Sequence, residues 1–107
     1  MKCFGKLAAL IIIVLFVTFN LCYAQNDLEE TYHKGLDYLT QGKFKKAISY
    51  FDKIVEINPR SSKAYGSRGF AYMKLGNTDM ACADWERACE LGRCANYNIA
   101  ARKGMCE

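Results

Sequence analysis

The reactive side chains of this sequence are its thiols. Four of the six cysteines lie in the last third of the chain, at Cys82, Cys89, Cys94 and Cys106. Thiols can form disulfides, bind zinc or exchange electrons. The gaps of 7, 5 and 12 residues lack the paired short spacings of structural zinc sites, and they contain no Cys-x-x-Cys motif. We therefore expect disulfides rather than a metal site or a redox-active pair.

The N-terminal segment indicates the compartment that these thiols meet. Lys2 and Lys6 precede an uncharged run at 7–19, and the segment ends at Ala24 before Gln25. A basic start, a short apolar run and small residues before a cleavage point are typical of a signal peptide. The sequence therefore predicts a signal peptide at 1–24 and an exported domain at 25–107, an environment in which disulfides persist.

Two alternatives for this segment stay open. A retained transmembrane anchor would need the whole uncharged stretch, and Asn20 interrupts its apolar part. A lipidated Cys22 would require a small residue before it, where this chain has Leu21. Both alternatives are weaker than cleavage after Ala24.

Composition and charge exclude several broad classes. A chain of 107 residues, 24% charged and 51% hydrophobic, is typical of one small globular domain. Removal of 1–24 leaves 13 basic and 11 acidic residues, a net charge of +2, so no nucleic-acid footprint is expected. Lys43, Lys45 and Lys46 cluster without aromatic residues arranged beside them, and we interpret them as a solvated helix end.

A block of residues recurs after an interval of 34. Gly35, Tyr38, Gly42, Ala47, Phe51 and Ile57 reappear as Gly69, Tyr72, Gly76, Ala81, Trp85 and Leu91. Apolar residues within each copy fall at helical spacing, so each copy is expected to form two helices. The predicted helices are 27–41, 44–57, 62–75 and 78–91, with a further helix at about 95–105.

The predicted helix ends carry suitable residues. Gly42 and Gly76 can adopt the left-handed conformation that ends a helix, and Pro59 ends the first copy. Ser61 or Ser62, and Thr78, are the expected N-caps of the helices that follow.

These residues resemble the tetratricopeptide repeat, whose signature spaces an aromatic residue, Leu-Gly, Tyr, Ala, Phe and Pro at set intervals. The copy at 28–61 matches with Gly35, Tyr38, Ala47, Phe51 and Pro59, and the copy at 62–95 with Tyr65, Gly69, Tyr72, Ala81 and Trp85. The sequence departs from the signature at Thr31, Lys34, Arg68 and Arg93. The resemblance implies an all-α fold of two helix-turn-helix repeats and a C-terminal capping helix at about 95–106.

The repeat interval also predicts how the cysteines pair. Cys82 and Cys89 correspond to Ile48 and Val55 of the first copy, so both should face the next helix. They lie two turns apart, roughly 10 Å along one helix, and cannot bridge each other. An antiparallel neighbouring helix would bring Cys94 near Cys89 and Cys106 near Cys82. The predicted disulfides are therefore Cys82 to Cys106 and Cys89 to Cys94.

The resemblance also implies a concave face, lined by the first helix of each repeat, that binds an extended peptide or a partner helix. The corresponding residues here are Tyr32, Leu36, Leu39, Phe70, Met73 and Tyr97. Leu36 and Phe70 are equally well explained as core residues, so Tyr32, Met73 and Tyr97 are the stronger candidates. Tyr32→Ala or Tyr97→Ala is expected to weaken partner binding by roughly 1 to 2 kcal/mol and to leave the fold intact. Family members that hold a peptide's C-terminal carboxylate use Lys and Asn where this chain has Tyr32, Leu36 and Ser67, so that mode is not expected.

No catalytic constellation is visible. The only histidine, His33, has no neighbouring nucleophile motif, and the glycines are spaced by the repeat rather than gathered in a phosphate loop. We expect a non-catalytic protein-interaction module or scaffold of a bacterial type, without metal or cofactor, in the periplasm or cell envelope, or secreted. The alternatives are a membrane-tethered assembly subunit that keeps 1–24, and a redox or enzyme accessory protein that uses its cysteines.

The first prediction concerns the N-terminus of the native protein. Cleavage of the signal peptide should give a protein that begins at Gln25, because Ala24 is the small residue before the cleavage point. N-terminal sequencing of the protein from its native cell measures this. A protein that still carries 1–24 would favour the membrane-tethered alternative.

Overall fold

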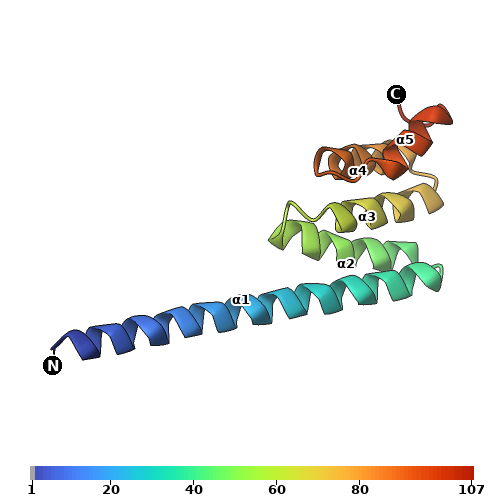
Figure 1. The fold of residues 1–107 in the computed structure, drawn as a ribbon. Coiled ribbons are helices and arrows are strands. Elements are labelled where there is room, and N and C mark those ends of the chain that lie inside the picture. Colours follow the sequence, from blue (N-terminus) through green and yellow to red (C-terminus); the bar gives the residue numbers. More distant parts are fainter. Residues whose placement is uncertain (1) are drawn as a thin grey trace. The chain divides into compact units, whose positions relative to one another are not determined.

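The computed structural model describes residues 2–107, with side chains from Leu7 onward, and the regular structure in this range is helical (Figure 1). The predicted signal peptide includes Met1, which lies outside the described residues. The helices are α1 (Lys2–Thr40), α2 (Phe44–Ile57), α3 (Ser62–Lys74), α4 (Thr78–Glu90) and α5 (Ala95–Arg102). The all-α expectation is confirmed for this part of the chain.

The first helix differs from its prediction. We expected a helix that begins near Asp27, whereas α1 runs from Lys2 to Thr40 without a break. The reason is local, since residues 20–30 contain neither glycine nor proline to interrupt a helix. The chain divides into two compact units, Met1–Glu30 and Thr31–Glu107, so α1 contributes to both.

In the N-terminal unit the described apolar side chains from Leu7 to Ala24 are exposed. Phe16 and Tyr23 are each 68% accessible to solvent. The stretch of α1 from Leu7 onward reaches a mean hydropathy of 2.5 with none of that window buried. By length and composition this helix could cross a membrane, and a signal sequence has the same properties.

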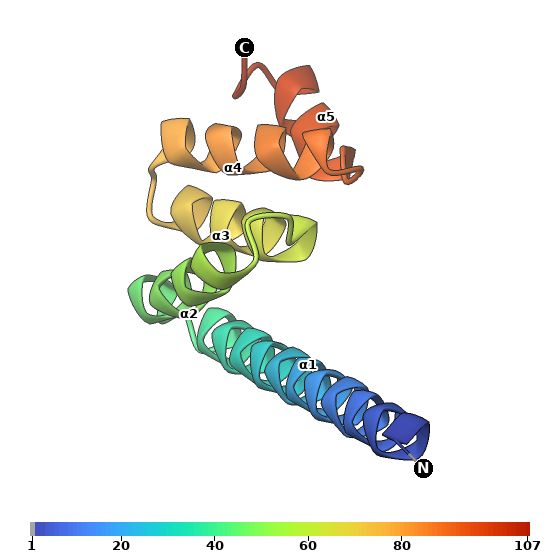
Figure 2. The same ribbon diagram turned by 90° about the vertical axis from the view of Figure 1, so that its left-hand side faces the viewer.

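In the second unit, α2, α3, α4 and α5 pack in chain order, each against the next (Figure 2). Small side chains and a few large ones form the core. Phe51 is fully buried and Trp85 is 4% exposed, and the remaining core side chains are mostly alanines. Alanine at these positions lets neighbouring helices approach closely, and the aromatic rings fill the space that remains.

Both repeats have a glycine under an aromatic ring. A Cβ atom added at Gly35 would lie 2.6 Å from Cε1 of Phe51, and one added at Gly69 would lie 2.7 Å from Nε1 of Trp85. The aromatic rings are the nearest atoms at both positions, and the Ala81 carbonyl oxygen lies 3.1 Å from the Gly69 position.

Apart from the start of α1, the N-cap of α4 and the end of α5, the helix ends agree with the sequence prediction. Gly42 and Gly76 have positive φ angles of 74° and 80°, as a helix-ending glycine requires. Ser61 accepts a hydrogen bond from the Ala64 amide at 3.4 Å. The N-cap of α4, however, is Asn77 and not Thr78.

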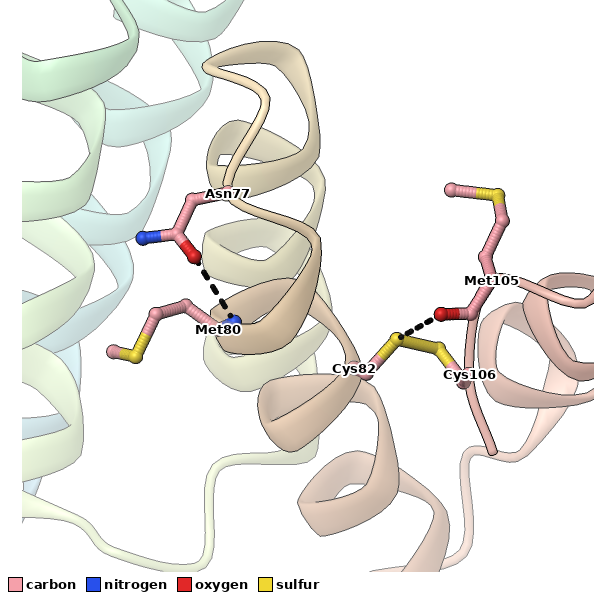
Figure 3. Close-up of a disulfide and its surroundings, with 5 residues drawn as sticks. All are labelled: Asn77, Met80, Cys82, Met105 and Cys106. Carbon is pink, nitrogen blue, oxygen red and sulfur yellow. Dashed lines mark hydrogen bonds between the residues drawn. A yellow bond between two sulfur atoms is a disulfide. The ribbon is translucent and has the colours of Figure 1, made fainter.

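The carboxamide oxygen of Asn77 accepts from the Met80 amide at 3.3 Å (Figure 3). Asparagine is a strong N-cap, and its position one residue earlier lets the helix begin at Thr78.

The capping helix is shorter than predicted. The expected span was 95–106, but α5 ends at Arg102. Gly104 has a φ angle of 70°, and the Met105 amide donates to the Ala100 carbonyl at 2.9 Å, which closes the helix with a glycine turn. The chain after this turn leads Cys106 back to α4.

The glycine contacts give a matched test within one helix. Gly69→Ala should lower the free energy of unfolding by about 1–3 kcal/mol, because its methyl group meets the Trp85 ring and the Ala81 carbonyl. Gly66→Ala should leave stability unchanged or raise it by up to about 1 kcal/mol, because its nearest neighbour is 3.8 Å away and alanine favours a helix. Urea unfolding followed by circular dichroism measures both. Equal losses at the two positions would contradict the close contact.

Candidate functional site

A groove of about 640 Å³ lies between α3 and the segment that joins α4 to α5. Two of the predicted partner-binding residues line it, Leu39 from the end of α1 and Phe70 from α3, and Phe70 is 40% exposed. The remaining lining residues are Ser62, Lys63, Gly66, Ser67, Ala88, Gly92, Arg93, Cys94, Ala95 and Asn96. The groove therefore combines an exposed aromatic ring with hydroxyl, carboxamide and basic groups.

Tyr32 links α1 to α3 at this groove. Its hydroxyl lies 3.0 Å from the Ser67 hydroxyl, within hydrogen-bond distance. Its ring packs against Phe51 with centroids 5.7 Å apart, and the Lys63 ammonium lies 4.6 Å from the ring centroid. Half-buried Tyr32 thus supports the fold, so Tyr32→Ala would remove packing as well as any partner contact.

The other three predicted residues have different surroundings. Leu36 is half-buried on α1. Met73 and Tyr97 pack against the core cluster of Ala81, Trp85, Ala100 and Cys106. Tyr97 also lines a second cavity, of about 510 Å³, beside the Cys82 to Cys106 disulfide. The structure thus brings Leu39 and Phe70 together in the groove and places Met73 and Tyr97 next to the core.

Both predicted cysteine pairs are bonded. Cys82 and Cys106 have Cα atoms 5.5 Å apart, and those of Cys89 and Cys94 are 3.9 Å apart. Cys82 Sγ also lies 3.3 Å from the Met105 carbonyl oxygen (Figure 3). Because Cys94 lines the groove, the Cys89 to Cys94 bridge ties one wall of the groove to the end of α4.

The disulfide near the C-terminus closes a loop with a sequence separation of 24. In the chain-entropy account, such a bridge contributes roughly 3 kcal/mol by constraining the unfolded chain. That contribution matters here because two repeats and one further helix bury less core than the three repeats that such arrays usually need.

Arg68 joins three helices through its guanidinium group. On α3, it donates from Nε and Nη2 to the two carboxylate oxygens of Asp84 on α4, at 2.9 and 2.7 Å. Its third nitrogen donates to Asp52 on α2 at 2.8 Å. Asp84 is only 4% exposed, whereas the Asp52 side chain is 52% exposed.

The ion pair keeps Arg68 in its charged form. Its hydrogen bonds to Asp84 raise the pKa of the Arg68 guanidinium further above its ordinary value, so Arg68 stays protonated. Burial raises the pKa of the neighbouring Tyr72 phenol, and the Asp52 carboxylate raises it further. The planar guanidinium matches both carboxylate oxygens at once, which a lysine could not do.

The contribution of Arg68 was not predicted from the sequence. The available signal was its departure from the leucine of the repeat signature, together with an acidic residue, Asp84, in the next helix. Arg93 and Asn96 were also missed as groove residues. Arg93 lies in the segment that joins α4 to α5, whose path the repeat interval does not specify, and Asn96 lies in the first turn of α5.

The stack of helix hairpins defines the class of protein, an α-helical repeat module. Two tetratricopeptide-repeat family models match the chain, at residues 29–61 and 50–83. Residues 29–83 are therefore tetratricopeptide repeats.

Several curated proteins are similar over the same region. Hsp70-Hsp90 organizing protein 2 of Arabidopsis thaliana is 30% identical over 69 residues, and heat shock protein STI1 of Saccharomyces cerevisiae is 35% identical over 68. Human serine/threonine-protein phosphatase 5 is 31% identical over 65 residues. These matches cover 64%, 64% and 61% of this chain but only 12%, 11% and 13% of the respective relatives.

A solved structure supports the fold. The "TPR2AB-domain:pHSP90-complex of yeast Sti1" superposes with a TM-score of 0.61 at 25% sequence identity. The match covers 71% of this chain and 33% of that chain.

The ion pair predicts a large loss of stability from a single substitution. Arg68→Met should lower the free energy of unfolding by about 3–5 kcal/mol, because it leaves the buried Asp84 carboxylate without a partner. Arg68→Met combined with Asp84→Leu should recover most of this loss. Asp52→Asn should cost less than about 1 kcal/mol, since Asp52 is exposed. Urea unfolding measures all three, and no recovery in the double variant would contradict the role of the buried charge.

Proposed function

We propose that this chain is a non-catalytic, exported protein-interaction module that binds an extended peptide or a partner helix in the groove beside α3. The observation that carries the proposal is the exposed Phe70 in a groove of about 640 Å³ whose far wall is tied by the Cys89 to Cys94 disulfide. A fixed groove with an accessible aromatic ring suits protein recognition, because aromatic side chains supply much of the binding energy at interfaces.

The similar proteins support a protein or peptide as the partner. The yeast Sti1 structure is named as a complex with pHSP90, and the similar protein of Arabidopsis thaliana is named for organizing Hsp70 and Hsp90. The match extends over only a small part of those relatives. We therefore carry over the class of partner to this chain and not the partner itself.

The groove indicates which kind of segment fits. Where related repeats that hold a C-terminal carboxylate use Lys and Asn, this chain has Tyr32, Leu36 and Ser67, and the Tyr32 and Ser67 hydroxyls contact each other. The accessible surface instead offers Phe70 and Leu39 to an apolar side chain. The proposed ligand is therefore a segment with an apolar residue at its centre rather than a chain end.

The proposed location follows from charge and cysteine chemistry. Lys2 and Lys6 precede the apolar run, and the next basic side chain after it is Lys34. This bias supports the proposal that the N-terminus faces the cytoplasm and that the repeats lie across the membrane, whether 1–24 is cleaved or kept. The periplasm, the cell envelope and the exterior are all oxidising enough for the two disulfides.

Two alternatives have less support. A membrane-tethered assembly subunit would keep α1 as an anchor, and the exposed apolar side chains of that helix permit it. A redox accessory would need a reactive thiol, whereas the four cysteines of the repeat unit are bonded. Cys22 is the free, exposed cysteine among the side chains that the structure describes, and cleavage after Ala24 would remove it.

Phe70→Ala tests the groove. Because Phe70 is 40% exposed, its truncation should leave the fold intact and weaken partner capture by about 1–2 kcal/mol. The measurement is quantitative recovery of crosslinked partners from the native cell with each variant. Ile99→Ala is the matched control, since Ile99 is 52% exposed and does not line the groove. Equal recovery with Phe70→Ala and Ile99→Ala would contradict the proposal.

A further inference from the structure

A second concave surface lies at the turn between α1 and α2. It consists of two adjoining cavities, of about 350 and 440 Å³, which share Lys43 and Lys46. The first is also lined by Lys34, Asp37, Tyr38, Gln41 and Tyr50, and the second by Gly42, Phe44, Lys45 and Leu75. We call these two cavities together the turn patch.

Two lysines of the turn patch, Lys43 and Lys46, lie near an aromatic ring. Tyr38 from α1 and Tyr50 from α2 stack with their centroids 5.3 Å apart. The ammonium groups of Lys43 and Lys46 lie 6.0 and 5.4 Å from the Tyr38 ring centroid, and Lys53 lies 5.0 Å from that of Tyr50. The lysine cluster is solvent-exposed at the start of α2, as the sequence predicted, and two of its members also lie near the Tyr38 ring. Cation–π contacts restrict the lysines and lower the entropy lost when they meet an anion.

The second cavity of the patch is apolar and open. Phe44 is half-buried, Leu75 is 43% exposed, and the Cβ position of Gly42 has no neighbour within 4 Å. Lys43, Lys45 and Lys46 surround this pocket, and all three are exposed. An apolar hollow with a basic rim matches an apolar side chain flanked by carboxylates.

We propose that the turn patch binds an acidic segment of a partner protein that carries one apolar side chain. The apolar side chain enters the pocket of Gly42, Phe44 and Leu75, and neighbouring aspartates or glutamates pair with Lys43 and Lys46. Charge complementarity supports this occupant, because Asp37 is the one acidic residue among the described residues that line the two cavities. The site is separate from the groove beside α3, with which it shares no lining residue.

The same geometry disfavours two other anionic partners. Single-stranded nucleic acid binds by stacking its bases on open aromatic faces. Here Tyr38 and Tyr50 cover each other, and ammonium groups lie over both rings. A membrane surface takes up protruding apolar side chains, whereas Phe44 and Leu75 line a hollow.

The test measures binding of a fluorescein-labelled peptide, in which leucines alternate with aspartates and glutamates, to the full chain as purified from the expressing cell. Lys43→Glu with Lys46→Glu should weaken binding about tenfold or more, and added salt should weaken binding to the native chain. Arg102→Glu with Lys103→Glu is the matched control. It makes the same change in net charge on exposed residues at the end of α5 and should preserve the affinity.

Further variants separate the parts of the proposal. Leu75→Ser should lower the affinity severalfold through the apolar pocket, and the peptide with asparagine and glutamine in place of the acids should not bind. Circular dichroism checks that each variant is folded. Equal affinity of the Lys43 and Lys46 double variant and its control would overturn the proposal. Capture of anionic vesicles or an oligonucleotide through Lys43 and Lys46, without capture of the peptide, would overturn it as well.

Discussion

The close crossing of two helices at a glycine under an aromatic ring is the contact on which the rest of the repeat unit depends. Gly69 leaves room for the Trp85 indole, and the same indole donates from Nε1 to the Gly66 carbonyl at 3.2 Å. Gly35 leaves room for Phe51 in the same way. With α3 held this closely to α4, Phe70 on α3 lines the groove. A side chain at either glycine would separate the helices and change the groove together with the core.

Polar and covalent links supplement this packing because the array is short. Arg68 connects α2, α3 and α4, and the buried Asp84 requires it. A leucine at position 68, as the repeat signature has it, could pair with neither carboxylate, whereas the guanidinium contacts one on α4 and one on α2. The two disulfides then hold α5 and the end of α4, where a longer array would have a further repeat. Stability that a longer protein obtains from more core comes here from specific links.

The two concave surfaces are products of the same architecture. The groove lies beside α3 and the turn patch lies at the turn between α1 and α2, so one short module has two separate surfaces, one with an exposed aromatic ring and one with a basic rim. Simultaneous binding of two weak segments raises the overall affinity well above that of either one, provided that the partner can reach both. If one partner occupies both proposed surfaces, this small module binds it firmly although each surface is modest.

The sequence by itself determined the helices, their order and the pairing of the cysteines. It could do so because the interval of 34, the helical spacing of apolar residues and the glycines at helix ends are local or strictly periodic signals. It misplaced the start of α1, the N-cap of α4 and the end of α5, where single residues decide the outcome. Only the tertiary structure decided which side chains share a surface. Arg68 meets Asp84, Lys46 meets Tyr38, and Met73 packs on the core, because such contacts depend on how neighbouring helices cross and turn, which no single segment specifies.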